Sequence, residues 1–169
     1  MTPQKEPFRK YALNEIPAPQ RRRRPPDAAY KVINPILGLL LRSPLHSPIS
    51  KRLLLLEFTG RKSGKRYRLP ITYVQDGAAL LLSTQSRWKT NLRGGARVTA
   101  WLGGKQRLGT AELITDANGT GEALERMVRA EPGFGQIIGV GVGPDGRIPP
   151  ADLDRVRAEG FVAIRITLD

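Results

Sequence analysis

The sequence predicts a mainly β (α+β) protein with six strands, one N-terminal helix and two or three peripheral helices. Six short segments are rich in apolar, β-branched or aromatic residues, which is typical of strands. Other segments have apolar residues at helical spacing and are bounded by Gly or Pro. A chain of 169 residues without an apparent internal repeat suits one domain with a sizeable core.

The first 28 residues are expected to form a flexible, basic and proline-rich arm. They contain six prolines and the arginine run Arg21–Arg24, and they lack apolar periodicity. They also lack the apolar core of a secretory signal. The folded domain is therefore expected to cover residues 29–169.

The segment Tyr30–Leu41 is expected to be a helix that Pro35 starts or kinks. It is too short to span a bilayer, which takes about 20 apolar residues. Packing of this helix over the rest of the domain is the favoured interpretation. The alternative is a peripheral membrane contact through Arg21–Leu41, because each basic residue near an anionic surface contributes about 1 kcal/mol.

The strand-like segments follow in order. The first is an apolar block, the second is rich in aromatic and β-branched residues, the fourth and fifth are joined by a glycine pair suited to a hairpin, and the last alternates strictly. The expected strands are Leu53–Phe58, Tyr67–Val74, Ala79–Thr84, Ala96–Leu102, Arg107–Thr115 and Phe161–Leu168.

Helical pieces are expected between these strands. Gln85–Gly95 should form one or two turns that Ser86 caps, with Trp88 and Leu92 on one face. Three more helical segments are bounded by Gly and Pro. They are Gly121–Ala130, Phe134–Val140 and Ala151–Ala158.

The turn between the first two strands concentrates positive charge. Gly60 and Gly64 bracket it and allow positive φ or close approach of a ligand, and Ser63 adds a hydroxyl. Guanidinium groups bind phosphate or carboxylate at two points, so the turn is suited to an anion. The alternative is a solvated hairpin tip that only aids solubility. The cations of the turn are Arg61, Lys62, Lys65, Arg66 and Arg68.

Charge is unevenly distributed along the chain, whose formal net charge is +13. Residues 42–107 contain 14 Lys or Arg and two acids, whereas residues 108–169 contain six Lys or Arg and ten acids. This asymmetry favours a localised positive site over a generally basic surface.

Composition excludes several classes of site. The chain has no Cys, which removes disulfides, thiolate metal sites and cysteine nucleophiles. Its single histidine, His46, cannot form a multi-histidine metal site, so no metal is expected. The stretch from Gly60 lacks the spacing of a phosphate-binding Walker loop, and Pro144 interrupts the G-x-G-x-x-G pattern that starts at Gly141.

Two stretches resemble the deazaflavin (F420)-dependent nitroreductase and quinone reductase family, whose members are split β-barrel proteins of the FMN-binding-like superfamily. They are TGRKSGKRYRLPITYVQDG, from Thr59 to Gly77, and RWKTNLRGGARVT, from Arg87 to Thr99. The order of elements also fits, and the resemblance covers roughly Pro35–Thr115. It implies a six-stranded split β-barrel and, as is common for such barrels, a homodimer.

The resemblance also implies a cytoplasmic oxidoreductase. Reduced coenzyme F420 (F420H2) would transfer hydride to a small-molecule acceptor, either a quinone, a nitro compound or another conjugated compound. The coenzyme tail carries a phosphodiester and several carboxylates, which the basic turn would bind. At two positions the chain differs from the family pattern. Thr72 stands where some members have a Tyr, and Tyr67 stands where an Arg is expected late in the turn.

Site residues carried over by the resemblance fall into three groups. Those for the phosphate and tail are Arg61, Lys62, Ser63 and Gly64, with Arg66 and Arg68 beside them. Those bordering the deazaflavin ring are Pro70 and Thr72, with polar contacts from Ser83 and Thr84. Those closing the other side of the ring are Trp88, Asn91 and Leu92.

No catalytic side chain is assigned. Hydride moves directly from the coenzyme, so the protein mainly orients the reactants, excludes water and stabilises developing charge. Tyr67 and Tyr73 are the nearest phenols, and alternation along one strand places both on the same face, which is either exterior or core.

Three alternatives stay open. The first is an FMN-binding split-barrel oxidoreductase, and the second is a non-catalytic protein that binds a flavin or another planar polyanion. The third is a basic nucleic-acid-binding β-barrel, suggested by a pI near 10.9 and by the arginine run. Nucleic acid is the least favoured partner, because strand aromatics are few. For the location, the sequence leaves open whether the expected cytoplasmic protein also associates with a membrane.

Overall fold

The computed structural model describes residues 53–169. The predicted arm and the predicted helix Tyr30–Leu41 lie outside the described residues, as does His46. The division of the chain into an arm and a domain from residue 29 therefore stays a prediction.

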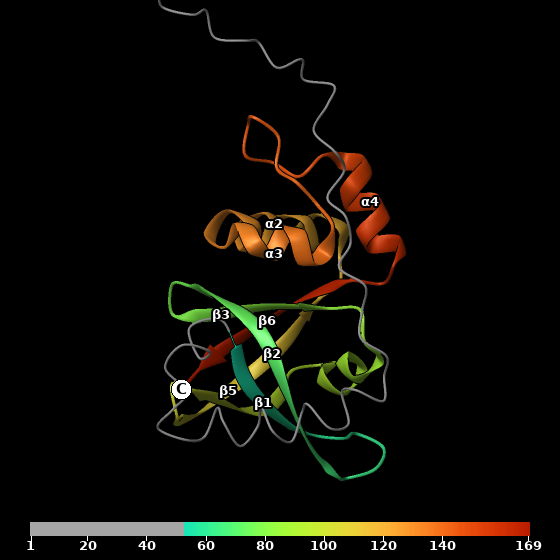
Figure 1. Cartoon of the computed structure of the whole chain (residues 1–169). Coiled ribbons are helices and arrows are strands. Elements are labelled where there is room, and N and C mark those ends of the chain that lie inside the picture. The colour runs from blue at the N-terminus through green and yellow to red at the C-terminus, as the bar shows by residue number, and fades with distance from the viewer. Residues whose placement is uncertain (1–52) are drawn as a thin grey trace, which may run out of the picture.

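Six antiparallel strands form a closed barrel in the order β1-β2-β3-β6-β5-β4 (Figure 1). The pairs β1–β2, β2–β3 and β4–β5 are hairpins, while β6 returns late in the chain to close the barrel between β3 and β5. The predicted six-stranded fold is confirmed. The strands are β1 (Leu53–Thr59), β2 (Arg66–Asp76), β3 (Ala79–Thr84), β4 (Ala96–Leu102), β5 (Lys105–Ile114) and β6 (Val162–Leu168).

Four helices accompany the described strands. A 3₁₀ helix, η2 (Arg87–Leu92), follows β3, and α2 (Ala117–Ala130), α3 (Pro132–Ile138) and α4 (Pro150–Ala158) lie between β5 and β6. Helix α2 begins four residues before the predicted start, because the Asp116 carboxylate accepts a hydrogen bond from the Gly119 N–H at 2.7 Å and caps it.

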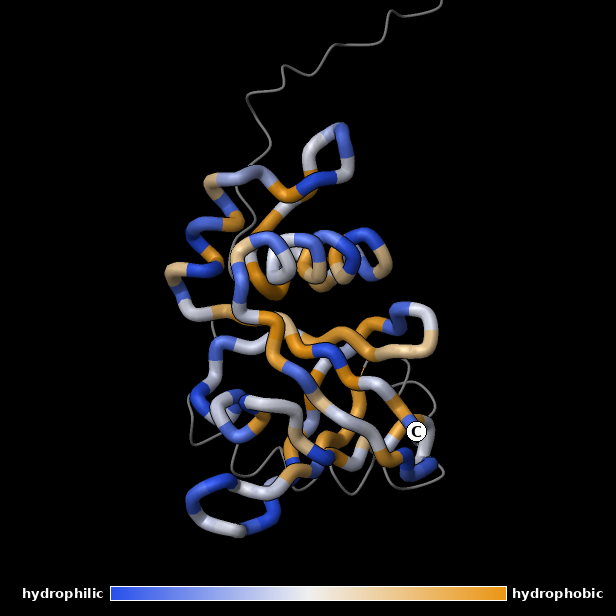
Figure 2. The backbone as a smooth tube through the Cα atoms, turned by 180° about the vertical axis from the view of Figure 1, so that it is seen from behind, coloured by the Kyte–Doolittle hydropathy of each residue, from blue (hydrophilic) through white to orange (hydrophobic). Residues whose placement is uncertain are grey.

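Two apolar cores follow from the alternation of side chains along the strands. Inside the barrel, even-numbered residues of β1 and β3 such as Leu54, Leu56 and Leu82 are fully buried. Outside it, Val74 and Leu81 pack against residues of helices α2, α3 and α4, which lie above the barrel in Figure 2. The buried helix residues of this second core are Leu124, Met127, Val128, Phe134, Ile138 and Val156.

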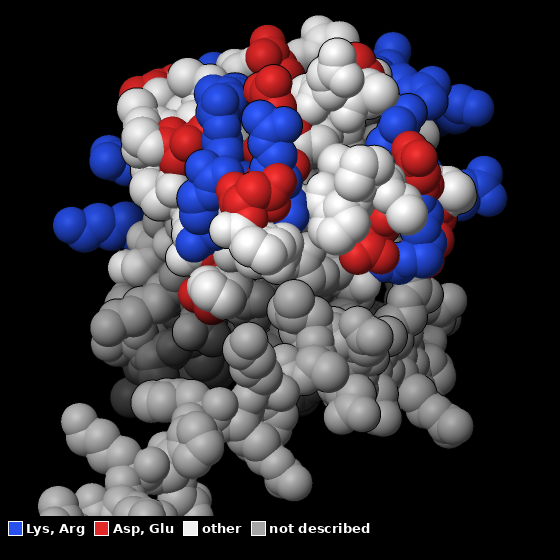
Figure 3. Space-filling view, turned by 90° about the horizontal axis from the view of Figure 1, so that it is seen from above, with Lys and Arg blue, Asp and Glu red and all other residues white. Residues whose placement is uncertain are grey.

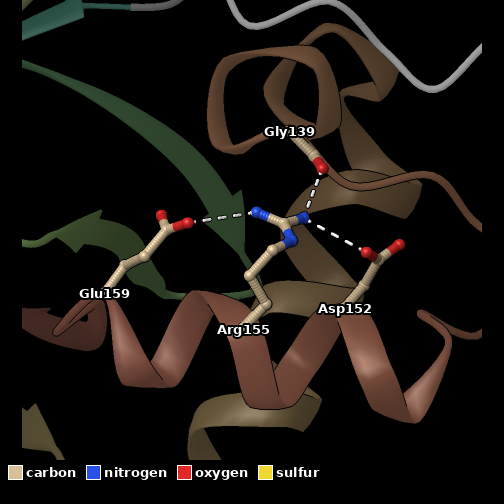
Figure 4. A network of polar contacts seen from close by, with 4 residues as sticks. All are labelled: Gly139, Asp152, Arg155 and Glu159. Carbon is tan, nitrogen blue, oxygen red and sulfur yellow. Dashed lines mark hydrogen bonds and ion pairs between the residues drawn. The ribbon is translucent and has the colours of Figure 1, made fainter.

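Arg155 links α4 to the end of α3 through hydrogen bonds (Figure 4). Its guanidinium donates hydrogen bonds to the Gly139 carbonyl at 2.5 Å, to Asp152 at 3.2 Å and to Glu159 at 3.3 Å. Seen from the helix side, Lys and Arg lie interleaved with Asp and Glu (Figure 3). Ion pairs in this part of the chain include Arg126 with Asp76 and Arg157 with Asp154.

Candidate functional site

The basic turn, residues 60–65, projects from the barrel between β1 and β2 (Figures 1 and 2). The Gly60 N–H donates to the Lys65 carbonyl and the Gly64 N–H to the Gly60 carbonyl, both at 2.8 Å. Gly64 has the expected positive φ of 63°. Gly60 is needed for space instead, because a Cβ there would lie 2.5 Å from Ser63 Oγ and 2.7 Å from the Tyr67 ring.

Asn91 joins the basic turn to η2. Its Oδ1 accepts a hydrogen bond from the Arg61 backbone N–H at 3.0 Å, and its Nδ2 donates to the Trp88 carbonyl at 2.9 Å. The Arg61 guanidinium also reaches the Arg93 carbonyl at 3.4 Å. Two stretches that lie 30 residues apart in sequence are thereby brought into one site.

An aromatic stack lies behind this junction. Phe58 stacks on Trp88, with ring centroids 5.4 Å apart, and on Tyr67, with centroids 5.7 Å apart. Leu92 is fully buried in the barrel core and anchors η2. Trp88 and Leu92 therefore share the barrel-facing side, as predicted from their spacing.

The predicted capping of η2 by Ser86 is wrong. Ser86 occupies the N-cap position, but its side chain makes no capping hydrogen bond. Its backbone N–H instead donates to Thr84 Oγ1 at 3.1 Å, so the Thr84 hydroxyl stabilises the connection between β3 and η2.

The five cations of the hairpin differ in their partners. Glu57 forms ion pairs with Arg68 and, at 3.6 Å, with Arg66, which partly neutralises both. Within residues 53–169, Arg61, Lys62 and Lys65 are exposed and form no ion pair with an acid. These three charges are the ones available to an external anion.

Strand β2 separates the predicted ring contacts into two faces. Leu69, Ile71 and Tyr73 pack against the barrel core, so Pro70 and Thr72 point to the outer surface. The predicted residues Trp88 and Leu92 pack toward the interior side. These two groups of predicted contacts do not share one face of the barrel.

Tyr67 and Tyr73 both lie on the inward face of β2. Of the two faces that the sequence left open for them, exterior or core, the core face is the correct one. Burial raises the pKa of Tyr73 above its ordinary value. Tyr67 is 43% exposed at the rim, and its hydroxyl lies 3.2 Å from Ser63 Oγ. Of the two phenols, only Tyr67 is close to the basic turn.

Ser83 and Thr84 lie at the end of β3 and point to opposite faces. Ser83 Oγ donates to the Val162 carbonyl at 3.0 Å. Thr84 is almost completely buried and accepts the Ser86 N–H. Both hydroxyls already serve the connection between β3, β6 and η2.

Lys89 is a residue of this region that sequence reasoning did not single out as a site. Its Nζ donates to the Gly160 carbonyl and, at 3.4 Å, to the Gln85 carbonyl. Burial, followed by repulsion from Arg93, lowers its pKa below the ordinary lysine value. Lys89 lines a pocket of about 510 Å³, whose other walls come from distant segments, so no local sequence pattern could have indicated it.

The described residues offer neither a metal site nor a membrane-spanning helix. Residues 53–169 contain no group of three His, Cys, Asp or Glu side chains that could hold a metal ion. In the same range, no helix has the length and apolar character needed to cross a membrane.

Comparison with protein families decides the assignment. Residues 43–138, more than half of the chain, match the model of the F420H(2)-dependent quinone reductase family. The chain belongs to this family. As a family member it is an F420H2-dependent oxidoreductase with coenzyme F420 as its cofactor, which confirms the predicted enzyme class and the predicted coenzyme.

Solved structures similar to this F420H2-dependent reductase share little sequence with it. An F420-H2 dependent reductase (FDR-A) has 17% identity and a TM-score of 0.47, covering 69% of this chain and 94% of its own. An FAD- and heme-binding protein from Mycobacterium smegmatis has 14% identity and a TM-score of 0.43, covering 80% and 65%. An FAD-binding protein from Mesorhizobium loti has 14% identity and a TM-score of 0.42, covering 78% and 86%. No curated protein matches the chain.

The residues at the junction fit the chemistry of F420. The coenzyme tail is polyanionic, and the turn offers three exposed cations without acidic partners in the described part of the chain. The Phe58–Trp88 stack supplies a rigid apolar surface directly beside these charges.

Proposed function

We propose that the basic turn binds the phosphate and carboxylates of the F420H2 tail and that the enzyme reduces a quinone, a nitro compound or another conjugated acceptor. The observation that carries this proposal is the Arg61–Asn91 hydrogen bond of 3.0 Å, which links the cationic turn to the helix that bears Trp88. Binding of a coenzyme with a polyanionic tail and a planar ring requires a cationic surface and an aromatic surface side by side.

The residues of the chain have separable tasks in this proposal. When bound, the reduced coenzyme supplies the hydride. Arg61 and Lys62 would hold the tail, with charged hydrogen bonds of about 1.5–3 kcal/mol each. Asn91 would keep the turn in its binding geometry. The buried side chain of Leu92 would fix η2, so that Trp88 excludes water from one side of the ring.

The complete predicted set of site residues is retained as a proposal, with Leu92 acting through its packing in the barrel core. The turn group, which meets the tail, is Arg61, Lys62, Ser63 and Gly64. The outer strand group is Arg66, Arg68, Pro70 and Thr72. The group at the end of β3 and on η2 is Ser83, Thr84, Trp88, Asn91 and Leu92. Tyr67 and Tyr73 are kept as the candidates for a catalytic side chain, and of the two Tyr67 is the one exposed at the rim of the barrel.

A fluorescence titration with oxidised F420 tests the tail site. The double variant Arg61→Ala/Lys62→Ala should bind F420 about 100-fold more weakly, because two charged hydrogen bonds are lost. Lys105→Ala, which removes an exposed cation from the start of β5, is the matched control and should bind normally. Equal affinity of the double variant and the wild type would contradict the assignment.

Oligomeric state and location are also proposals. A homodimer, a cytoplasmic location and a peripheral membrane contact through Arg21–Leu41 stay predictions. Sedimentation of the full chain, with and without anionic vesicles, measures the dimer and the membrane contact. A vesicle-bound fraction that disappears when Arg21–Arg24 are replaced by Gln would support the membrane contact.

A further inference from the structure

Helix η2 contacts the turn between α4 and β6 as well as the basic turn. The Lys89 ammonium donates a hydrogen bond to the Gly160 carbonyl in the α4–β6 turn. In Figure 1, η2 is the unlabelled green helix, with α4 above it and the basic turn below. The 510 Å³ pocket lies at the junction of η2 with α4 and β6.

The pocket has the size and lining of a site for a small ring compound. Ligand pockets usually measure about 300–1,000 Å³ and combine apolar walls with a few polar groups. Phe161 and Val162 supply apolar surface, and Thr115 supplies a hydroxyl. Lys89 and Arg157 supply positive charge, while Asp154, also in the lining, lies 3.4 Å from Arg157. A cation without a paired acid is thus left on the η2 side, at Lys89.

Lys89 is held in a fixed position. An ammonium group has three N–H donors, and two of them are directed to the Gly160 and Gln85 carbonyls. One N–H remains for a ligand in the pocket that Lys89 lines. A donor already oriented by the protein stabilises negative charge without reorganisation when that charge develops.

The pocket also borders two of the residues assigned to the coenzyme ring, Ser83 and Trp88. Val162 lines the pocket, and its carbonyl accepts the hydrogen bond from Ser83, a predicted ring contact. Trp88, another predicted ring contact, is the neighbour of Lys89 in η2. A molecule in the pocket would therefore be next to the residues assigned to the ring.

We infer that this pocket binds the electron acceptor, a ring compound with a carbonyl or nitro oxygen, and that Lys89 donates its remaining hydrogen bond to that oxygen. The inference rests on the proposed function and adds the place of the second substrate. The acceptor gains one hydrogen and two electrons as hydride, so one negative charge stays on its oxygen until a proton arrives from water. The fixed ammonium stabilises this charge.

Calorimetric titration of the full chain tests the inference, with 1,4-naphthoquinone and its 2-hydroxy derivative, an enolate near neutral pH, as probes. Lys89→Met should weaken binding of the enolate about tenfold or more, since a charged hydrogen bond is lost. Lys89→Arg should retain most of the affinity. Ala158→Trp, which fills the pocket without removing a hydrogen bond, should weaken binding of both probes. Lys105→Met is the control and should bind both normally.

The titrations are run with and without oxidised F420, so that the two proposals fail separately. Variants at Lys89 and Ala158 should bind F420 within about twofold of the wild type, whereas Arg61→Ala/Lys62→Ala should not. Normal F420 binding together with equal quinone affinity in all variants would overturn the acceptor pocket and leave the tail site intact. Absence of quinone binding to the wild type would overturn it as well. If Lys89→Met fails to fold, Ala158→Trp decides the outcome.

Discussion

Replacement of Asn91 by Ala should uncouple the basic turn from η2. The change removes the acceptor for the Arg61 N–H at 3.0 Å and the donor to the Trp88 carbonyl at 2.9 Å. Two neutral hydrogen bonds of about 0.5–1.5 kcal/mol each predict a loss of roughly 1–3 kcal/mol in the free energy of unfolding. For a chain of this size, each kcal/mol lowers the melting temperature by about 2–4 °C.

The same variant should bind F420 more weakly, because the turn must be ordered before its cations can meet the tail together. We expect a loss of about tenfold, corresponding to 1.4 kcal/mol. Fluorescence titration measures the affinity, and amide hydrogen exchange at Arg61 reports the freed N–H directly.

Thr90→Ala is the matched control for Asn91→Ala. Thr90 Oγ1 donates to the Arg87 carbonyl at 2.9 Å within η2 and does not reach the basic turn. This variant should destabilise η2 locally, while the Arg61 amide stays protected from hydrogen exchange. Equal effects of the two variants on F420 affinity, or an unchanged Arg61 exchange rate in Asn91→Ala, would refute the coupling.

Three further predictions concern the barrel and the turn. Gly60→Ala should destabilise the protein by about 1–3 kcal/mol, measured by thermal unfolding, because its Cβ would lie 2.5 Å from Ser63 Oγ; a variant as stable as the wild type would contradict this crowding. Glu57→Gln should strengthen F420 binding several-fold at low salt, since it frees Arg66 and Arg68, and a titration at two salt concentrations checks that the gain fades as salt rises. Leu92→Ala should lose about 2–5 kcal/mol of stability in denaturant unfolding, as expected of a fully buried side chain, and a loss below 1 kcal/mol would mean that η2 is not anchored by it.

The barrel was largely predictable from the sequence because its strands are bounded by strong local signals. Ala79–Thr84 and Ala96–Leu102 match β3 and β4 residue for residue. The Gly103–Gly104 hairpin also forms as expected, with positive φ at both glycines. Strand β2 begins at Arg66, one residue before its predicted start, where its register sets Arg68 opposite Glu57 of β1.

The start of α2 and the pocket were not predictable in the same way. Residues 118–121, NGTG, are poor helix formers, yet the Asp116 cap and burial of Thr120 hold them in α2. The pocket combines residues from η2, from α2, from α4 and from β6. Only the tertiary fold brings these together. The shared location of Arg61 and Asn91 was expected from the resemblance, whereas their hydrogen bond required the structure.

The position of β6 in the barrel has a consequence for how the chain folds. Ser83 and Val162, which are joined by a hydrogen bond at the start of the β3–β6 pairing, are 79 residues apart. The hairpins β1–β2, β2–β3 and β4–β5 can form locally, but the barrel cannot close before β6 has been synthesised. On the ribosome, the edges of β3 and β5 therefore stay open while helices α2 to α4 are made. Chaperone binding to these edges, and slow closure once β6 has been synthesised, are the kinetic signature to expect.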